Sequence, residues 1–294
     1  MAAPLLGEAR ATHHRIALGA FEVTAVLDGA PMREGVHPTF GHDQTAEAFT
    51  AYARARRMPA SRYEAVFVPA LVNTGRELVL FDTGVGAAAR AGGSGQLLSR
   101  LAAAGYTPEM VDVVALTHCH PDHIGGLWED GAPAFPNARY AIGRAEYDGW
   151  LSGEAIPPQR SGSRETFLKL VPPLAERATF LEPGDSVASG ITAVEAHGHS
   201  VGHMAYLAES GGRSLLLWGD VANHPVFSVE RPEWEVSFDD DKERAIETRK
   251  RILDWVATDA IPVLGFHMPF PGIGFIEHVA ESYRYVPETY RLKV

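Results

Sequence analysis

The stretch THCHPDHIGG, residues 117–126, brings three histidines and one aspartate together within six positions. The candidate metal ligands in it are His118, His120, Asp122 and His123. The first two stand two apart at the end of an apolar run, VDVVALTH (111–118), which predicts a buried strand, so both imidazoles should project to the same face. The proline after them ends the strand, and the second pair follows where the chain should turn toward a helix. Four candidate ligands in two separate pairs suit two adjacent metal ions better than one.

A second histidine-rich stretch, EAHGHSVGHMAYL (195–207), offers an alternative, because GHSVG within it fits the G-x-S-x-G pattern of serine hydrolases. Ser200, Asp220 and His267 also follow one another in the α/β-hydrolase order of nucleophile, acid and base. A serine hydrolase would, however, leave THCHPDHIGG without a role, and its elbow needs a strand, a tight turn and then a helix. Here ITAVEA (191–196) leads into the turn, but the residues after it are typical of another strand. We therefore expect Ser200 to be a turn residue beside a metal ligand.

Length, composition and charge narrow the class of protein. The 294 residues, 46% hydrophobic and 21% charged, are ordinary for a soluble globular protein and long enough for one large domain or two small ones. We expect a single domain over 1–294. A formal net charge of −11 argues against a nucleic-acid partner, which needs a basic face. Cys119 is the only cysteine, so no internal disulfide is possible. The N-terminal sequence lacks the pattern of a signal peptide, and no apolar run approaches the roughly 18 residues that span a bilayer. We expect a cytoplasmic protein without a membrane partner, possible homodimerisation being left open.

Strands alternate with helices along the chain, which favours an α/β or α+β layered fold. The predicted elements are a strand at 21–29, a hairpin at 64–84, a helix at 95–105, a hairpin at 204–220, a helix at 239–259 with Ile246, Leu253 and Val256 on one stripe, and a strand at 261–267. Two segments fit no core element, 31–49 and the region of about 146–190. Long irregular stretches are often functional loops, so both are candidate lids or pocket walls, and ordinary surface insertions are an equal alternative.

The spacing His-x-His-x-Asp-His in THCHPDHIGG resembles the signature of the metallo-β-lactamase superfamily. Four further motifs of that family can be matched in order: Asp82 in VLFDTGVG, His199 in AHGHSVGHM, Asp220 in LLLWGDVAN and His267 in IPVLGFHMPFPGIG. Three other stretches resemble the methyl-parathion-hydrolase-like or lactonase-like branch: LVNTGRELVLFDTG, FPNARYAIGRAEYDGW and HMPFPGIGFIEHVAESYRYVPETY. The resemblance implies an αββα sandwich, in which two mixed sheets are flanked by helices.

The resemblance also implies the site. One metal would be held by His118, His120 and His199, a second by Asp122, His123 and His267, and Asp220 would bridge them. Asp82 would support the site from outside the ligand set. Five imidazoles and two carboxylates without a thiolate suit Zn²⁺, the family default, and would also accept Mn²⁺, Co²⁺ or Fe²⁺.

A site of this kind implies a dinuclear metal-dependent hydrolase with a small-molecule substrate. Two divalent ions, Asp122, Asp220 and one hydroxide leave a small net positive charge, and bound water would have its pKa lowered toward roughly 7. A metal-bridging hydroxide would attack a lactone, a carboxylic ester or a phosphotriester. The alternative is a metal-dependent redox enzyme of the flavodiiron type, which has Glu where this chain has His120 and carries a flavodoxin domain.

Substrate selection is less clearly indicated by the sequence. Homoserine-lactone hydrolases of the superfamily commonly have a tyrosine three residues after the bridging aspartate, and this chain has Asn223 there. An ester or lactone is the preferred natural substrate, with phosphotriester hydrolysis as a side activity. Aromatic side chains that could line the pocket, or equally lie in the core, are Phe40, Phe227, Trp234, Phe238 and Phe270.

Overall fold

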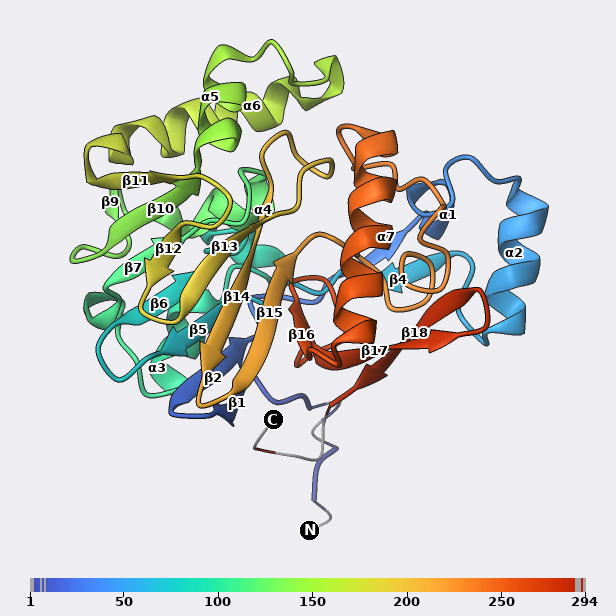
Figure 1. The fold of residues 1–294 in the computed structure, drawn as a ribbon, viewed down its shortest axis with the longest axis horizontal. Coiled ribbons are helices and arrows are strands. Elements are labelled where there is room, and N and C mark those ends of the chain that lie inside the picture. The colour runs from blue at the N-terminus through green and yellow to red at the C-terminus, as the bar shows by residue number, and fades with distance from the viewer. Residues whose placement is uncertain (1–2, 6, 8, 289–291, 293–294) are drawn as a thin grey trace.

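Two seven-stranded sheets face each other in the computed structural model (Figure 1), which describes residues 3–5, 7, 9–288 and 292. The first sheet has the order β1-β2-β5-β6-β7-β10-β11, and the second has the order β12-β13-β14-β15-β16-β17-β18. Both sheets are mixed: β6, β7, β10 and β11 pair in parallel in the first, and β15 pairs in parallel with β16 in the second.

The strands of the first sheet are β1 (His13–Leu18), β2 (Phe21–Val26), β5 (Ala70–Asn73), β6 (Leu78–Phe81), β7 (Val113–Ala115), β10 (Arg139–Gly143) and β11 (Ala178–Leu181). Those of the second sheet are β12 (Ser186–Ala188), β13 (Ile191–Glu195), β14 (Met204–Ser210), β15 (Arg213–Gly219), β16 (Val263–Gly265), β17 (Ile273–Val279) and β18 (Ser282–Pro287). Two short ribbons pair β3 (Met32–Glu34) with β4 (Arg62–Glu64) and β8 (Trp128–Glu129) with β9 (Ala132–Pro133). The helices are α1 (Val36–Thr39), α2 (Ala46–Ala55), α3 (Leu97–Ala103), α4 (Pro121–Ile124), α5 (Arg144–Ser152), α6 (Ser161–Leu170) and α7 (Lys242–Thr258).

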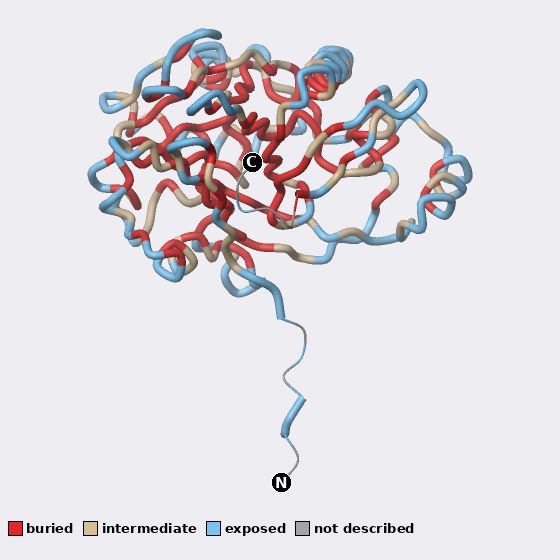
Figure 2. Tube along the Cα trace, turned by 60° about the horizontal axis from the view of Figure 1, so that its bottom comes forward, coloured by how far each residue is buried: buried red, intermediate tan, exposed pale blue. Residues whose placement is uncertain are grey.

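Three apolar layers hold these elements together. The central layer lies between the sheets, where the Phe81 and Tyr206 rings pack with centroids 5.1 Å apart. A second layer covers the outer face of the first sheet beneath α3, α5 and α6, and a third lies between the second sheet and α7. Figure 2 shows the buried part of the trace in the middle of the molecule and the exposed part around it. The predicted αββα sandwich is confirmed.

Most predicted elements are present, and their deviations have local causes. Both hairpins form, and the strand of 111–118 ends at Ala115 because the residues after it turn away to form the ligand loop. In α7, Leu253 and Val256 are buried as predicted, but Ile246 is half-buried, and Ala245 and Ile252 complete the apolar face instead.

The segments 31–49 and 146–190 are more regular than predicted, but both supply pocket wall as expected: Arg33 and Phe40 from the first and Arg160 from the second line a cavity. The first segment contains β3, α1 and the start of α2, and the second contains most of α5, all of α6 and strand β11 of the first sheet. The glycines and prolines that suggested loops lie at junctions: Gly153 ends α5 with φ 76°, and Pro158 begins a 3₁₀ turn, Pro158–Arg160. None of the helices in the described part of the chain is long and apolar enough to cross a membrane.

The loop before β14 touches α5 so closely that it requires a glycine. A Cβ atom at Gly202 would lie 2.0 Å from the Glu146 backbone nitrogen and 2.6 Å from the Ala145 carbonyl carbon. We predict that Gly202→Ala lowers the free energy of unfolding by about 1–3 kcal/mol or more, because backbone must move. Denaturant titration measures this change in the free energy of unfolding. Gly162→Ala is the matched control: its Cβ meets nothing within 4 Å, and it should stabilise α6 by roughly 0.5 kcal/mol. Equal effects of both substitutions would contradict the packing argument.

Candidate metal centre

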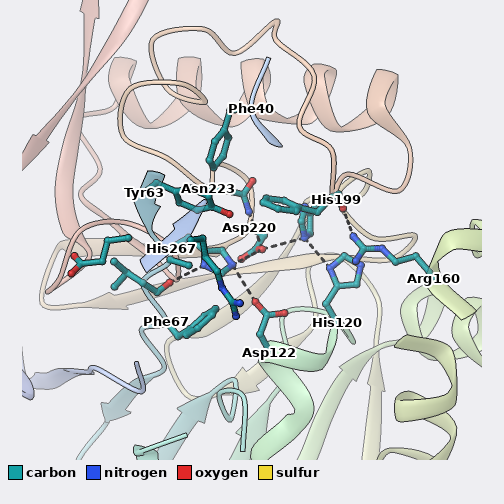
Figure 3. Close-up of a pocket in the computed structure, with 15 residues that line it drawn as sticks. Phe40, Tyr63, Phe67, His120, Asp122, Arg160, His199, Asp220, Asn223 and His267 are labelled. Carbon is teal, nitrogen blue, oxygen red and sulfur yellow. Dashed lines mark hydrogen bonds and ion pairs between the residues drawn. The ribbon is translucent and has the colours of Figure 1, made fainter. Parts of the chain in front are cut away.

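Seven side chains predicted as ligands converge at one end of the two sheets, each from a loop or helix start after a strand. His118 and His120 follow β7. Helix α4 begins directly after His120 and contains Asp122 and His123. The other three come from the second sheet: His199 from the β13–β14 loop, Asp220 directly after β15, and His267 after β16. Figure 3 shows His120, Asp122, His199, Asp220 and His267 pointing toward one another into a common cavity.

Three imidazoles form the first group. His120 Nδ1 lies 3.0 Å from both His118 Nε2 and His199 Nε2. Zinc–nitrogen bonds are about 2.0–2.1 Å long, so one cation could contact three nitrogens at this spacing.

The second group combines Asp122, His123 and His267. His267 Nε2 lies 3.4 Å from Asp122 Oδ2, and His123 Nε2 lies 3.7 Å from the same oxygen. Asp220 touches both groups: Oδ2 is 3.1 Å from His199 Nε2 and 3.0 Å from His267 Nε2, and Oδ1 is 3.4 Å from His123 Nε2. Asp220 therefore contacts imidazoles of both groups.

Two atoms in the middle of this cluster test whether the residues suit a cation. His123 Nε2 and Asp220 Oδ1 are buried and have no hydrogen-bond partner among the described residues. A buried polar atom left unpaired costs about 1–3 kcal/mol. A divalent cation between imidazole nitrogens and carboxylate oxygens would satisfy both atoms, so the residues fit a bound metal.

In each of the five imidazoles, the nitrogen that faces away from the cluster has a hydrogen-bond partner. The partners are the Thr117 hydroxyl for His118 (3.0 Å), Asp240 for His120 (3.2 Å), Asp82 for His123 (2.8 Å), Asp239 for His199 (2.8 Å) and the Val66 carbonyl for His267 (2.8 Å). Such bonds fix the ring orientation and direct the remaining lone pair inward.

Asp82 lies beneath the cluster and accepts three hydrogen bonds from the segments that carry His118 and His123. It accepts from His123 Nδ1 and from both the backbone N–H and the hydroxyl of Thr117, each at 2.8 Å. Its φ of 58° lies in the left-handed region, which is unfavourable for a residue with a side chain. Three hydrogen bonds thus fix a strained residue beneath two ligand-bearing segments.

Asp239 and Asp240 were not predicted as site residues. The run Asp239-Asp240-Asp241 was expected to be the acidic start of a helix, but only Asp241 caps α7, accepting from Arg244 N. Asp239 instead accepts from His199 Nδ1 at Oδ1 (2.8 Å) and from Arg249 Nη2 at Oδ2 (2.6 Å). The side chains of Asp239 and Arg249 are both fully buried. The available signal was an arginine within the apolar face of α7, because a buried guanidinium requires a carboxylate.

Glu146 was also missed, and it decides the role of Ser200. This fully buried carboxylate accepts from the Cys119 and Gly202 backbone nitrogens, from the Ser200 hydroxyl (2.7 Å each) and from Trp150 Nε1 (2.8 Å). Burial raises the pKa of Glu146 against these hydrogen bonds. Ser200 is buried and directed toward α5, so it is a turn residue as expected and not an exposed nucleophile.

A cavity of about 200 Å³ opens onto the cluster. Of the predicted pocket residues, Phe40, Phe238 and Asn223 line it, and Arg33, Tyr63, Phe67 and Arg160 line it without having been predicted. Figure 3 shows Phe40, Tyr63 and Asn223 on one side of this cavity and Arg160 beside His120.

Three of the aromatic candidates lie elsewhere. Phe227 lines a neighbouring pocket, and Phe270 packs against the core between the sheets. Trp234 packs against Tyr52 and Phe49, with ring centroids 5.0 and 5.8 Å away. For Trp234 and Phe270 the core alternative was therefore correct, since apolar burial and pocket walls need the same residue types.

Comparison with known proteins agrees with this geometry. The family described as the metallo-beta-lactamase superfamily matches residues 69–256. The chain belongs to the metallo-β-lactamase superfamily. Its histidine and aspartate groups are suited to divalent metal.

Two solved structures resemble nearly the whole chain. AidC, a dizinc quorum-quenching lactonase, is 25% identical with a TM-score of 0.87, and the match covers 95% of this chain and 98% of AidC. The hydrolase AbOPH is 28% identical with a TM-score of 0.86, and the match covers 97% of this chain and 100% of AbOPH. A probable metallo-hydrolase of Mycobacterium tuberculosis is 30% identical over 129 residues, which span 41% of this chain and only 40% of that relative.

The ligand imidazoles of this metallo-β-lactamase fold differ in protonation. Burial lowers the pKa of His199 and His267, but Asp220, together with Asp239 or Asp122, outweighs burial and raises the pKa to about 9 for His199 and about 10 for His267. In the metal-free protein both rings are therefore protonated on both nitrogens, and positively charged, at neutral pH. A metal can bind them only after displacing these protons.

We predict that zinc affinity of the metal-free protein rises with pH between about 6 and 9, by up to roughly tenfold per unit for each proton displaced. Competition with a chromophoric chelator, corrected for the chelator's own protonation, measures the affinity. Calorimetry in two buffers of different ionisation enthalpy counts the protons released. An affinity independent of pH over this range would contradict the protonation assigned to His199 and His267.

Proposed function

We propose that the seven converging residues hold two divalent cations, zinc in the first place, and that the protein hydrolyses a lactone or carboxylic ester, with phosphotriester hydrolysis as a side activity. The observation that carries the proposal is the position of Asp220, whose two carboxylate oxygens contact imidazoles of both ligand groups. The dizinc lactonase AidC, similar over nearly the whole chain, supports the same assignment.

In this proposal His118, His120 and His199 hold one cation, Asp122, His123 and His267 hold the other, and Asp220 contacts both. When bound, the cations would supply a water of lowered pKa as nucleophile and positive charge to stabilise the anion formed in the reaction. The five outer hydrogen bonds keep the imidazoles in place, so that little reorganisation is needed during turnover.

Asn223 and Arg160 complete the polar part of the cavity. Asn223 Nδ2 donates to Asp220 Oδ2 at 2.9 Å and so restricts the rotation of this carboxylate. Arg160 donates from Nε to Asp240 Oδ1 (2.7 Å) and from Nη2 to the Phe238 carbonyl. Because the guanidinium lines the cavity beside His120, it would attract a carboxylate product or a negatively charged oxygen of the substrate.

Metal removal tests the reaction class. We predict that a strong chelator abolishes hydrolysis of lactones and aryl esters and that zinc restores it, whereas serine-directed reagents have no effect. Metal analysis should give two equivalents of zinc per chain. Hydrolysis that persists after complete metal removal would refute the proposal, and iron together with bound flavin would favour the redox alternative.

Substitutions at the site test the residue roles. We predict that His120→Ala and Asp220→Ala each reduce kcat/KM by at least about 100-fold, because each removes a ligand. Ser200→Ala should change kcat/KM only slightly, although it removes a buried hydrogen bond to Glu146. Steady-state kinetics with metal content measured on the same samples checks this. A loss in Ser200→Ala as large as in Asp220→Ala would support a serine nucleophile instead.

A further inference from the structure

A second pocket adjoins the catalytic cavity. Its volume is about 430 Å³, and it shares Tyr63, Glu64, Val66 and His267 with the catalytic cavity. We call it the His224 pocket. Its apolar wall consists of Met32, Met58, Pro59, Val66, Phe227 and Pro269. Met32 is 56% exposed, which places an apolar side chain at the edge of the pocket. The charged members, Arg62 and Glu64, are also exposed and thus remain hydrated at the rim.

His224 brings one polar group into this wall. The residue is only 7% exposed, its ring stacks on Phe227 with centroids 4.3 Å apart, and it contacts Phe40 at 5.2 Å. Its Nδ1 accepts from the backbone N–H groups of Val226 and Phe227, both at 3.1 Å. Because Nδ1 accepts two hydrogen bonds, the ring proton of the neutral imidazole is on Nε2.

The protonation of His224 is fixed as well. Burial lowers the pKa of His224 to about 3, so the ring is uncharged at neutral pH. Nε2 has no hydrogen-bond acceptor in the part of the chain that the structure describes, and the residue lines the pocket. The His224 pocket therefore has a buried, uncharged N–H donor beside the apolar side chains of Met58, Pro59 and Phe227. Its other polar lining residues lie at the exposed rim, Arg62 and Glu64, or on the side shared with the catalytic cavity, Tyr63 and His267.

We propose that the His224 pocket receives the part of the substrate that extends beyond the reacting group, and that this part is apolar with one uncharged oxygen acceptor. His224 Nε2–H would donate to that oxygen. Beside Met58, Pro59 and Phe227 an ionised group is disfavoured, because it would lose its hydration with no charged partner among these side chains. This inference rests on the proposed function, since it concerns the substrate of the same metal centre. His224 is thereby a specificity-determining residue.

The test compares substrates that differ by one atom. Aryl esters of straight-chain acids are paired with analogues in which one chain methylene is replaced by an ether oxygen, and the oxygen is moved along the chain from pair to pair. The ratio of kcat/KM for each ether ester to that of its parent is measured for wild type, His224→Asn and His224→Gln. The Asn carboxamide can still accept from the Val226 and Phe227 N–H groups but does not reach into the pocket, so it separates the donor role from the turn. The Gln amide N–H can take the place of Nε2–H.

We expect the ratio for the best-placed ether oxygen to fall by about 3- to 10-fold in His224→Asn, mainly through KM, and to be retained in His224→Gln. A purely structural role would lower both esters of a pair equally, and an unchanged ratio in His224→Asn would overturn the inference. Calorimetric binding of the matching pairs of inert amides to the metal-loaded protein gives the same comparison without turnover. If no ester is hydrolysed in a metal-dependent way, the proposed function fails, while the amide pairs still decide whether His224 donates.

Discussion

The carboxylate of Asp220 lies buried among imidazoles that reach it from three other segments of the chain. Its two oxygens contact His123, His199 and His267 at 3.0–3.4 Å. One of these oxygens, Oδ1, has no hydrogen-bond partner among the described residues. Placing so many titratable groups together without water is unfavourable unless protons or cations neutralise them. In the absence of metal, raised pKa values at His199 and His267 provide that compensation. The rest of the molecule is arranged to keep this cluster together.

The supporting contacts connect both sheets and both outer layers. Asp82, at the end of β6, holds His123, and Asp239, just before α7, holds His199 and is itself paired with Arg249 inside that helix. Glu146 of α5 ties the loop between His118 and His120 to the loop after His199, because it accepts from Cys119 N and Gly202 N. Since buried carboxylates with several hydrogen bonds are costly to disrupt, these contacts make the ligand geometry a property of the whole sandwich.

The sequence predicted the inner part of this arrangement far better than the outer part. Four of the ligands lie close together in the sequence, so their spacing can be recognised: His118, His120, Asp122 and His123. Two others, Asp220 and His267, directly follow apolar runs that predict strands, and this places them at strand ends. Asp240 and Glu146 have no such signature, because their partners are 120 and 27 residues away and helix starts are commonly acidic. Segment 146–190 was misjudged for a related reason: its prolines and glycines lie at the junctions of short helices, where they look the same as those of a loop.

Much of the cavity wall comes from other parts of the chain than the ligands, and the two are connected through Val66, Asn223 and Arg160. Arg33, Phe40 and Tyr63 belong to the segment around β3 and β4, outside both large sheets, so the wall they form can vary without moving the ligand loops. Arg160 is different, because its partner Asp240 also holds His120. A change at Arg160 would therefore alter the charge facing the substrate and the anchoring of one ligand together. Selectivity in this fold can therefore be adjusted at Arg33, Phe40 and Tyr63, whereas a change at Asn223 or Arg160 also alters the support of a ligand.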